Sequence, residues 1–133
     1  MKVKHSEIFE SRISDVWRVM TDLNDYAWRS DISRIEVFEQ GNKFTEISTG
    51  GVETRFIVTD FQPVTRYAFS MENENFAGDW TGELSESGGK TLAVFTENIR
   101  PKRKILIVPA YFYMRLQQKT YFRDLKRALH ETE

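Results

Sequence analysis

The chain has 133 residues, no cysteine and a formal net charge of −1, with 40% hydrophobic and 14% aromatic residues. This length suits one domain with one core, and the apolar content argues against disorder. The balanced charge provides no global field that would draw the protein to nucleic acid or to an anionic membrane. Without cysteine, disulfides and thiolate chemistry are excluded.

The N-terminal stretch MKVKHSEIF alternates polar and apolar residues and lacks the continuous apolar run of a signal peptide. The longest apolar run, residues 105–114, is too short to cross a bilayer and contains Pro109. We therefore expect a soluble, cytoplasmic protein without stable membrane insertion, and one domain over residues 1–133.

Residues 2–10 alternate as a strand does, and the period then changes to that of a helix. The apolar positions of this predicted amphipathic helix, within residues 11–25, are Ile13, Val16, Trp17, Met20 and Leu23. Ser11 or Ser14 can cap its start. Residues 26–31 are expected to form a second short helical turn or an ordered loop.

From Ile32 onward the sequence predicts a series of strands separated by turn residues. Gly41-Asn42 and Gly50-Gly51 are typical of tight hairpin turns. Such consecutive hairpins indicate an antiparallel meander rather than parallel βαβ units. The predicted strands are residues 32–40, 43–49, 52–61, 65–73, 76–84 and 91–99.

The C-terminal segment has apolar residues at steps of three or four, which predicts a long amphipathic helix. Proline cannot donate a backbone hydrogen bond, so Pro109 must lie in the first turn or kink the helix. We expect a short helical turn after Pro101, a bend at Pro109 and a helix to about His130. The apolar positions are Ile107, Tyr111, Met114, Tyr121, Phe122, Leu125, Ala128 and Leu129.

The stretch SRISDVWRVMTD, followed by YAWRSDISRIEV, resembles the START-like helix-grip superfamily (SRPBCC), which includes polyketide cyclase/dehydrase and lipid-transport proteins. FTEIST, NFAGDWTGEL and VFTENI resemble a small bacterial branch of it. The resemblance covers essentially the whole chain. It implies an α+β helix-grip fold: a short helical pair after the first strand, and a curved antiparallel sheet of about six or seven strands wrapped around the C-terminal helix. It also implies a hydrophobic cavity between sheet and helix.

The stretch FAGDWTGEL places glycines on both sides of a large ring. If Trp80 points to the concave face, strand alternation sends Gly78 and Gly82 the same way, and both leave room beside the indole. The alternative is that the glycines let the sheet bend and the helix pack closely. We expect Trp80 to face the helix near Tyr111 or Met114.

Strand alternation predicts a concave set rich in aromatic residues, most of which form the core: Phe44, Glu46, Thr54, Phe56, Val58, Tyr67, Phe69, Met71, Trp80, Leu84, Ala93, Phe95 and Glu97. Tyr26 and Trp28 lie in the connection that resembles the mouth of the family's cavity, where they either gate a ligand or plug the core. The predicted ligand contacts are Tyr26, Trp28, Glu46, Thr54, Phe56, Phe69, Met71, Trp80, Phe95, Glu97, Tyr111 and Met114.

Glu46 and Glu97 are carboxylates on a predicted buried face, where an unpaired charge is costly. Either they are polar anchors or a general acid/base inside a cavity, or they pair with Arg29, Arg55 or a threonine hydroxyl or face solvent. They are the only candidate catalytic residues in the sequence.

No metal site or cofactor is expected. His5 and His130 form no obvious pair, and no nucleophile motif, phosphate-binding loop or dinucleotide fingerprint is present. The basic run at residues 100–104 either binds an anionic partner, such as a headgroup, a carboxylated ligand or a membrane surface, or is simply solvated.

Two functions follow from these features. The first is binding of a small to medium hydrophobic or amphipathic molecule in the cavity. The alternative is a cofactor-free enzyme, a polyketide cyclase/dehydratase-like protein or a hydrolase, that uses Glu46 or Glu97 as its base. The sequence carries no signal of oligomeric state.

Overall fold

Seven strands and one long helix dominate the computed structural model, which describes residues 1–131. The strands are β1 (Lys2–Phe9), β2 (Ile32–Phe38), β3 (Lys43–Ser48), β4 (Glu53–Gln62), β5 (Arg66–Glu72), β6 (Phe76–Ser87) and β7 (Lys90–Pro101). The helices are α1 (Ile13–Thr21), α2 (Ile107–Ala128) and the 3₁₀ turns η1 (Glu39–Gly41) and η2 (Lys104–Leu106).

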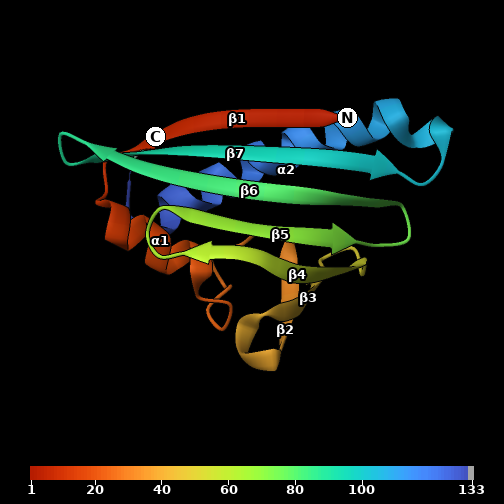
Figure 1. Ribbon diagram of the computed structural model, residues 1–133, viewed down its shortest axis with the longest axis horizontal. Helices are drawn as coiled ribbons and strands as arrows, with labels where there is room; N and C mark the ends of the chain where they lie inside the picture. The colour runs from red at the N-terminus through yellow and green to blue at the C-terminus, as the bar shows by residue number, and fades with distance from the viewer. Residues whose placement is uncertain (132–133) are drawn as a thin grey trace.

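All seven strands belong to one antiparallel sheet in the order β1-β7-β6-β5-β4-β3-β2. β1 lies at one edge of the sheet, beside the meander from β2 to β7, and pairs with β7 over its whole length. Figure 1 shows α2 running along one face of this curved sheet, with α1 at the end where α2 finishes. The predicted α+β helix-grip architecture is therefore confirmed.

The short N-terminal helix α1 buries Val16, Trp17 and Met20, as its periodicity predicts. The predicted serine cap is wrong, because Arg12 is the N-cap residue and no side chain bonds to the helix end. The hydroxyl of Ser11 instead donates to the carboxylate of Glu131 at 2.6 Å. This contact ties the start of α1 to the end of the chain that the structure describes.

The connections differ in detail from the prediction. Residues 22–31 form an ordered loop, one of the two predicted alternatives for residues 26–31, so the second helix of the pair that the resemblance implies is absent from this segment. The turn between β2 and β3 is the 3₁₀ turn η1, with Glu39, Gln40 and Gly41 all at positive φ, rather than a two-residue hairpin at Gly41-Asn42. Pro109 lies in the first turn of α2, where its missing N–H costs nothing, and the preceding change of direction is made by η2.

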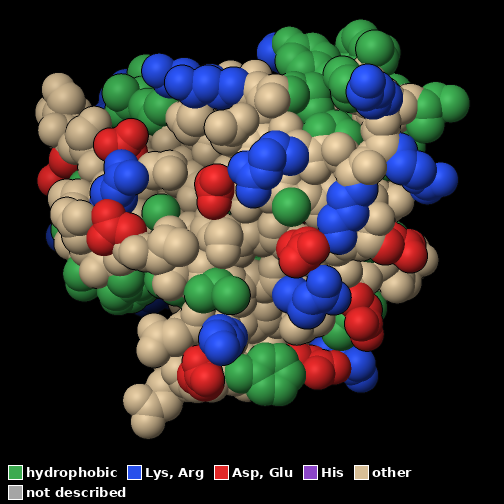
Figure 2. All heavy atoms as spheres, turned by 45° about the vertical axis from the view of Figure 1, so that its right-hand side comes forward, with side chains coloured by type: hydrophobic (Ala, Val, Ile, Leu, Met, Phe, Trp, Pro, Cys, Tyr) green, Lys and Arg blue, Asp and Glu red, His purple; other side chains and the backbone are tan. Residues whose placement is uncertain are grey.

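The long helix α2 presents its buried face only from Met114 onward. Met114, Gln118, Phe122 and Leu125 are buried, at helical spacing. The predicted apolar residue Ile107 is 48% exposed, because the first turns of α2 lie beyond the end of β1 (Figure 1). Figure 2 shows hydrophobic side chains gathered at this end of the molecule, among Lys and Arg.

The basic run before α2 is partly tied to the sheet. Lys102 Nζ lies 2.8 Å from a carboxylate oxygen of Glu72, and Arg100 lies 3.5 Å from Asp79. Exposed ion pairs of this kind contribute little to stability. Among residues 1–131, no helix is long and apolar enough to span a membrane.

Candidate functional site

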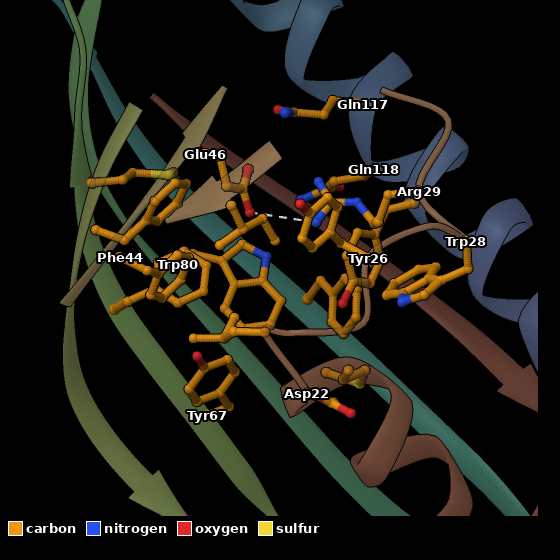
Figure 3. A pocket seen from close by; sticks show the side chains of 18 of the residues that line it. Asp22, Tyr26, Trp28, Arg29, Phe44, Glu46, Tyr67, Trp80, Gln117 and Gln118 are labelled. Carbon is orange, nitrogen blue, oxygen red and sulfur yellow. Dashed lines mark hydrogen bonds and ion pairs between the residues drawn. The ribbon is translucent and has the colours of Figure 1, made fainter. Parts of the chain in front are cut away.

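A cavity of about 90 Å³ lies between the concave face of the sheet, α2 and the loop 22–29 (Figure 3). It contains many of the predicted contacts: Tyr26, Trp28, Glu46, Phe56, Phe69, Met71, Trp80, Phe95 and Glu97. Strand alternation finds those that lie on strands, because every second side chain of β3 to β7 faces the helix, whereas Tyr26 and Trp28 were predicted from the family resemblance.

The remaining predicted contacts lie elsewhere. Thr54 lines a second cavity of about 60 Å³, where its hydroxyl accepts a hydrogen bond from Asn73. Tyr111 and Met114 line neither of these cavities, and Met114 is fully buried in the core. The helix approaches the cavity one turn later, through Gln117, Gln118 and Tyr121.

Sequence reasoning missed several wall residues, notably Met20, Leu23, Gln117 and Gln118. One signal for Gln118 was present. It stands four residues after Met114 and four before Phe122, so a polar side chain interrupts the buried stripe of the helix. A buried glutamine requires polar partners, and such an interruption can mark a polar site in an otherwise apolar interface.

The indole of Trp80 forms one wall. Its ring stacks on Phe69, with ring centroids 4.7 Å apart and planes 7° from parallel, and its centroid is 4.8 Å from that of Phe95. Of the two interpretations of Gly78 and Gly82, the one in which they leave empty space beside the indole is wrong. A Cβ at Gly82 would overlap the Trp80 ring itself, and one at Gly78 would lie 2.5 Å from the carbonyl oxygen of Asn98. Close packing therefore requires both glycines.

A second wall is a buried ion-pair network. The Arg29 guanidinium donates to Asp31 at 3.1 Å and to Glu46 at 3.4 Å, and it stacks 4.8 Å from the ring centre of Tyr121. Burial raises the pKa of Glu46, and the positive charge of Arg29 opposes this only in part. Of the predicted partners of Glu46, Arg29 is the one that binds it, whereas Arg55 lies beside Glu72.

The loop that carries Arg29 is fixed to α2. The buried carboxylate of Asp124 accepts hydrogen bonds from the backbone N–H and the hydroxyl of Ser30, at 2.8 and 2.7 Å. Trp28 donates from its ring nitrogen to the carbonyl of Asp25 and meets Tyr121 edge to face. These contacts hold the mouth of the cavity in place.

Glu97 is the second buried acid, 5% exposed. Its carboxylate accepts a hydrogen bond of 3.0 Å from the side-chain amide of Gln118. Burial raises the pKa of Glu97 to about 7; the Gln118 hydrogen bond opposes this, and the charge of Glu46 adds to it. Burial also raises the pKa of Tyr67 to about 12, so its hydroxyl stays protonated at neutral pH.

This shift predicts a pH-dependent stability. Since the folded state holds a proton on Glu97 up to about pH 7 and the unfolded chain loses it near 4.5, stability falls as pH rises through this window. The expected loss in the free energy of unfolding is about 3 kcal/mol. Glu97→Gln should remove this loss, so the stability of the variant relative to the wild type should rise between pH 4.5 and 8. Urea unfolding measures it, with Glu86→Gln, at an exposed site, as control. If the free energy of unfolding changed with pH in the same way for Glu97→Gln and wild type, the raised pKa of Glu97 would be contradicted.

The two cavities share a wall formed by Glu46, Phe56, Met71 and Gln117. Among residues 1–131, no cluster of three or more His, Cys, Asp or Glu side chains is suited to hold a metal ion. The site therefore combines aromatic walls, one buried ion-pair network and one carboxyl that titrates near neutral pH. This arrangement can bind a small molecule or exchange a proton with it.

A curved antiparallel sheet that grips a C-terminal helix around such a cavity defines the START-like fold, and solved structures agree. A START superfamily protein from Mycobacterium smegmatis superimposes with a TM-score of 0.85 at 9% identity, over 97% of each chain. An uncharacterised protein from Bacillus thuringiensis gives a TM-score of 0.83 at 14% identity, over 98% of this chain and 100% of its own. A conserved protein from Geobacillus kaustophilus gives a TM-score of 0.83 at 12% identity, over 98% of this chain and 95% of its own.

At these identities the similarity establishes the fold alone. No protein-family model and no curated protein matches the chain. The function must therefore be argued from the site.

Proposed function

We propose that this protein binds a small apolar or amphipathic molecule in the cavity between the sheet and α2. The observation that supports this most is the cavity itself, whose walls combine stacked aromatic rings with a few buried polar groups. Such a combination is typical of small-molecule sites, in which apolar area supplies affinity and polar groups fix orientation.

The size of the cavity limits the ligand. At about 90 Å³ it is well below the 300 to 1,000 Å³ typical of drug-sized ligands. The predicted range of small to medium ligands therefore narrows to molecules of a few non-hydrogen atoms. A longer molecule requires movement of the mouth or of the wall shared with the second cavity.

A series of straight-chain alcohols of two to ten carbons tests this proposal. Affinity should rise by about 0.8 kcal/mol per CH₂ until the chain fills the cavity, and then stop rising. The methyl groups of Met20 and Met71, which line the cavity, report binding by NMR, while that of Met114 in the core should not shift. The absence of saturable shifts at Met20 and Met71 would refute the proposal.

Two neighbouring positions on α2 supply a matched pair of variants. Gln117 lines both cavities, whereas Leu116 is 65% exposed on the outer face. Gln117→Trp should fill the space and weaken alcohol binding at least about tenfold, because the bound chain and the ring cannot occupy one volume. Leu116→Trp should leave alcohol binding unchanged. Equal binding by both variants would place the ligand elsewhere.

The burial of Glu97 favours a second candidate, a cofactor-free cyclase, dehydratase or hydrolase. A general acid/base works best when its pKa lies near the working pH, and the pKa of Glu97 is raised to about 7. Glu97 is the better candidate base, because Glu46 is engaged by Arg29. Any turnover found with carbonyl or ester substrates should then be lost in Glu97→Gln; turnover unchanged by this variant would refute the role.

A further inference from the structure

The side-chain amide of Gln118 is incompletely bonded in the described structure. Its nitrogen donates to Glu97 at 3.0 Å and to the backbone carbonyl of Val3 at 3.4 Å. Because the backbone carbonyl of Val3 can only accept, it determines the orientation of the amide, and the amide oxygen is left as an acceptor. That oxygen is buried and has no hydrogen-bond partner within the described residues. Gln118 itself is only 3% exposed, and it lines the cavity. A ligand with an N–H group could supply the donor that this oxygen lacks.

The charges around the cavity favour a cation. Among its lining residues, Asp22, Asp25, Glu46 and Glu97 carry carboxyl groups, and Arg29 alone carries a positive charge. Arg29 is already engaged by Glu46 and by Asp31 behind it. The mouth and the interior therefore hold more negative than positive charge.

The aromatic walls add to this preference. The faces of Trp28 and Tyr121 already lie against the Arg29 guanidinium, at 5.7 and 4.8 Å from the ring centres. Within residues 1–131 no protein cation lies over Trp80 or Tyr67, which also line the cavity. Electron-rich rings near the ammonium group favour a ligand cation, and Phe69 already covers one face of the Trp80 ring.

We propose that the cavity takes a small organic cation, a protonated primary amine on a short apolar body, whose N–H groups bond to the Gln118 oxygen and the Glu97 carboxylate. The apolar body then lies against Trp80 and its aromatic neighbours. This inference rests on the proposed binding function and names the ligand class. It gives a partner to the Gln118 oxygen, which lies beside the buried acid Glu97.

Three matched probes test the inference: propylamine, propanol and propionate, titrated into the whole protein at pH 8 with the Met20 and Met71 methyl groups as reporters. A charge-assisted hydrogen bond is stronger than a neutral one, so propylamine should bind about tenfold or more tighter than propanol, and propionate should not bind. Equal affinity of amine and alcohol would overturn the inference but leave the proposed function standing. Failure of all three, with the longer alcohols also silent, would refute the proposed function itself.

Conservative variants locate the amine. Glu97→Gln should weaken propylamine about tenfold more than it weakens propanol, while Glu86→Gln, at an exposed site, should change neither. Gln118→Met, which keeps the side-chain length and removes the acceptor, should also reduce the preference for the amine. If Gln118→Met unfolds the protein, Glu97→Gln alone decides. An unchanged preference for the amine in Glu97→Gln overturns the inference.

Proton release gives an independent measurement. At pH 6 Glu97 holds its proton in the free protein, and a bound ammonium group displaces it to the buffer. The groups that act on Glu97 are Glu46 of β3, whose negative charge raises its pKa, and Gln118 of α2, which donates to it, while Arg29 pairs with Glu46. Calorimetry in two buffers of different ionisation heat should show release near one proton for wild type and none for Glu97→Gln. Release that persists in Glu97→Gln would place the ammonium at Glu46 and contradict the inference.

Discussion

Replacing Trp80 with alanine is expected to lower the free energy of unfolding by about 3 to 4 kcal/mol, near the range for a packed aromatic residue. Trp80 is 9% exposed, and its ring packs against those of Phe69, Phe95 and Tyr67. Only part of its surface faces the cavity, so the ring acts mainly as core. Urea unfolding measures the loss, and a value below about 1.5 kcal/mol would show that the ring borders open space instead.

The same variant should accept larger ligands. The cavity of about 90 Å³ grows when the indole is removed, so the alcohol series should continue to gain affinity at longer chain lengths than in wild type. Unchanged dependence on chain length would mean that the bound chain does not lie against Trp80.

Gly82 supplies the control for this packing. A methyl group there would overlap the indole, so Gly82→Ala should cost about 1 to 3 kcal/mol in the wild type, because overpacking forces the ring out of its place. In the Trp80→Ala background the cost should disappear, since the space is then free. A double-mutant cycle measures the difference, and additive effects would contradict the contact.

Replacing Arg29 with methionine is the second change of large effect. It should cost about 3 to 5 kcal/mol, because Glu46 and Asp31 are left without their buried partner. The cost should be larger at pH 8 than at pH 5.5. The pKa of Glu46 is already raised by burial, and without Arg29 it rises further, so Glu46 binds a proton more readily as pH falls and part of the uncompensated charge is removed.

Two further variants separate charge from geometry. Arg29→Lys keeps the charge but loses the planar fork and the stacking on Tyr121, so an intermediate loss is expected. Adding Glu46→Leu to Arg29→Met should recover part of the stability, because a buried pair replaced as a whole costs less than a pair broken. A loss from Arg29→Met that is the same at both pH values, with no recovery in the double variant, would show that Arg29 acts by packing alone.

The order of strands and helices, the alternation of the sheet and the aromatic concave face could all be predicted from the sequence. These features depend on backbone periodicity. Apolar residues spaced by two indicate a strand, and apolar residues spaced by three or four indicate a helix. The positions of Glu46 and Glu97 on the inner face follow from the same alternation. The position of Pro109 in the first turn follows from its missing N–H.

Only the tertiary structure decided which side chains meet. Arg29 and Glu46 are brought together by the loop 22–31, whose path is set by the bond between Ser30 and Asp124. Gln118 reaches Glu97 because the position of α2 along the sheet places Gln118 opposite this residue of β7. The volume of the cavity depends on how the Trp80 ring folds over Gly82. None of these contacts has a local sequence pattern, because each depends on sheet curvature and helix placement summed over the whole chain.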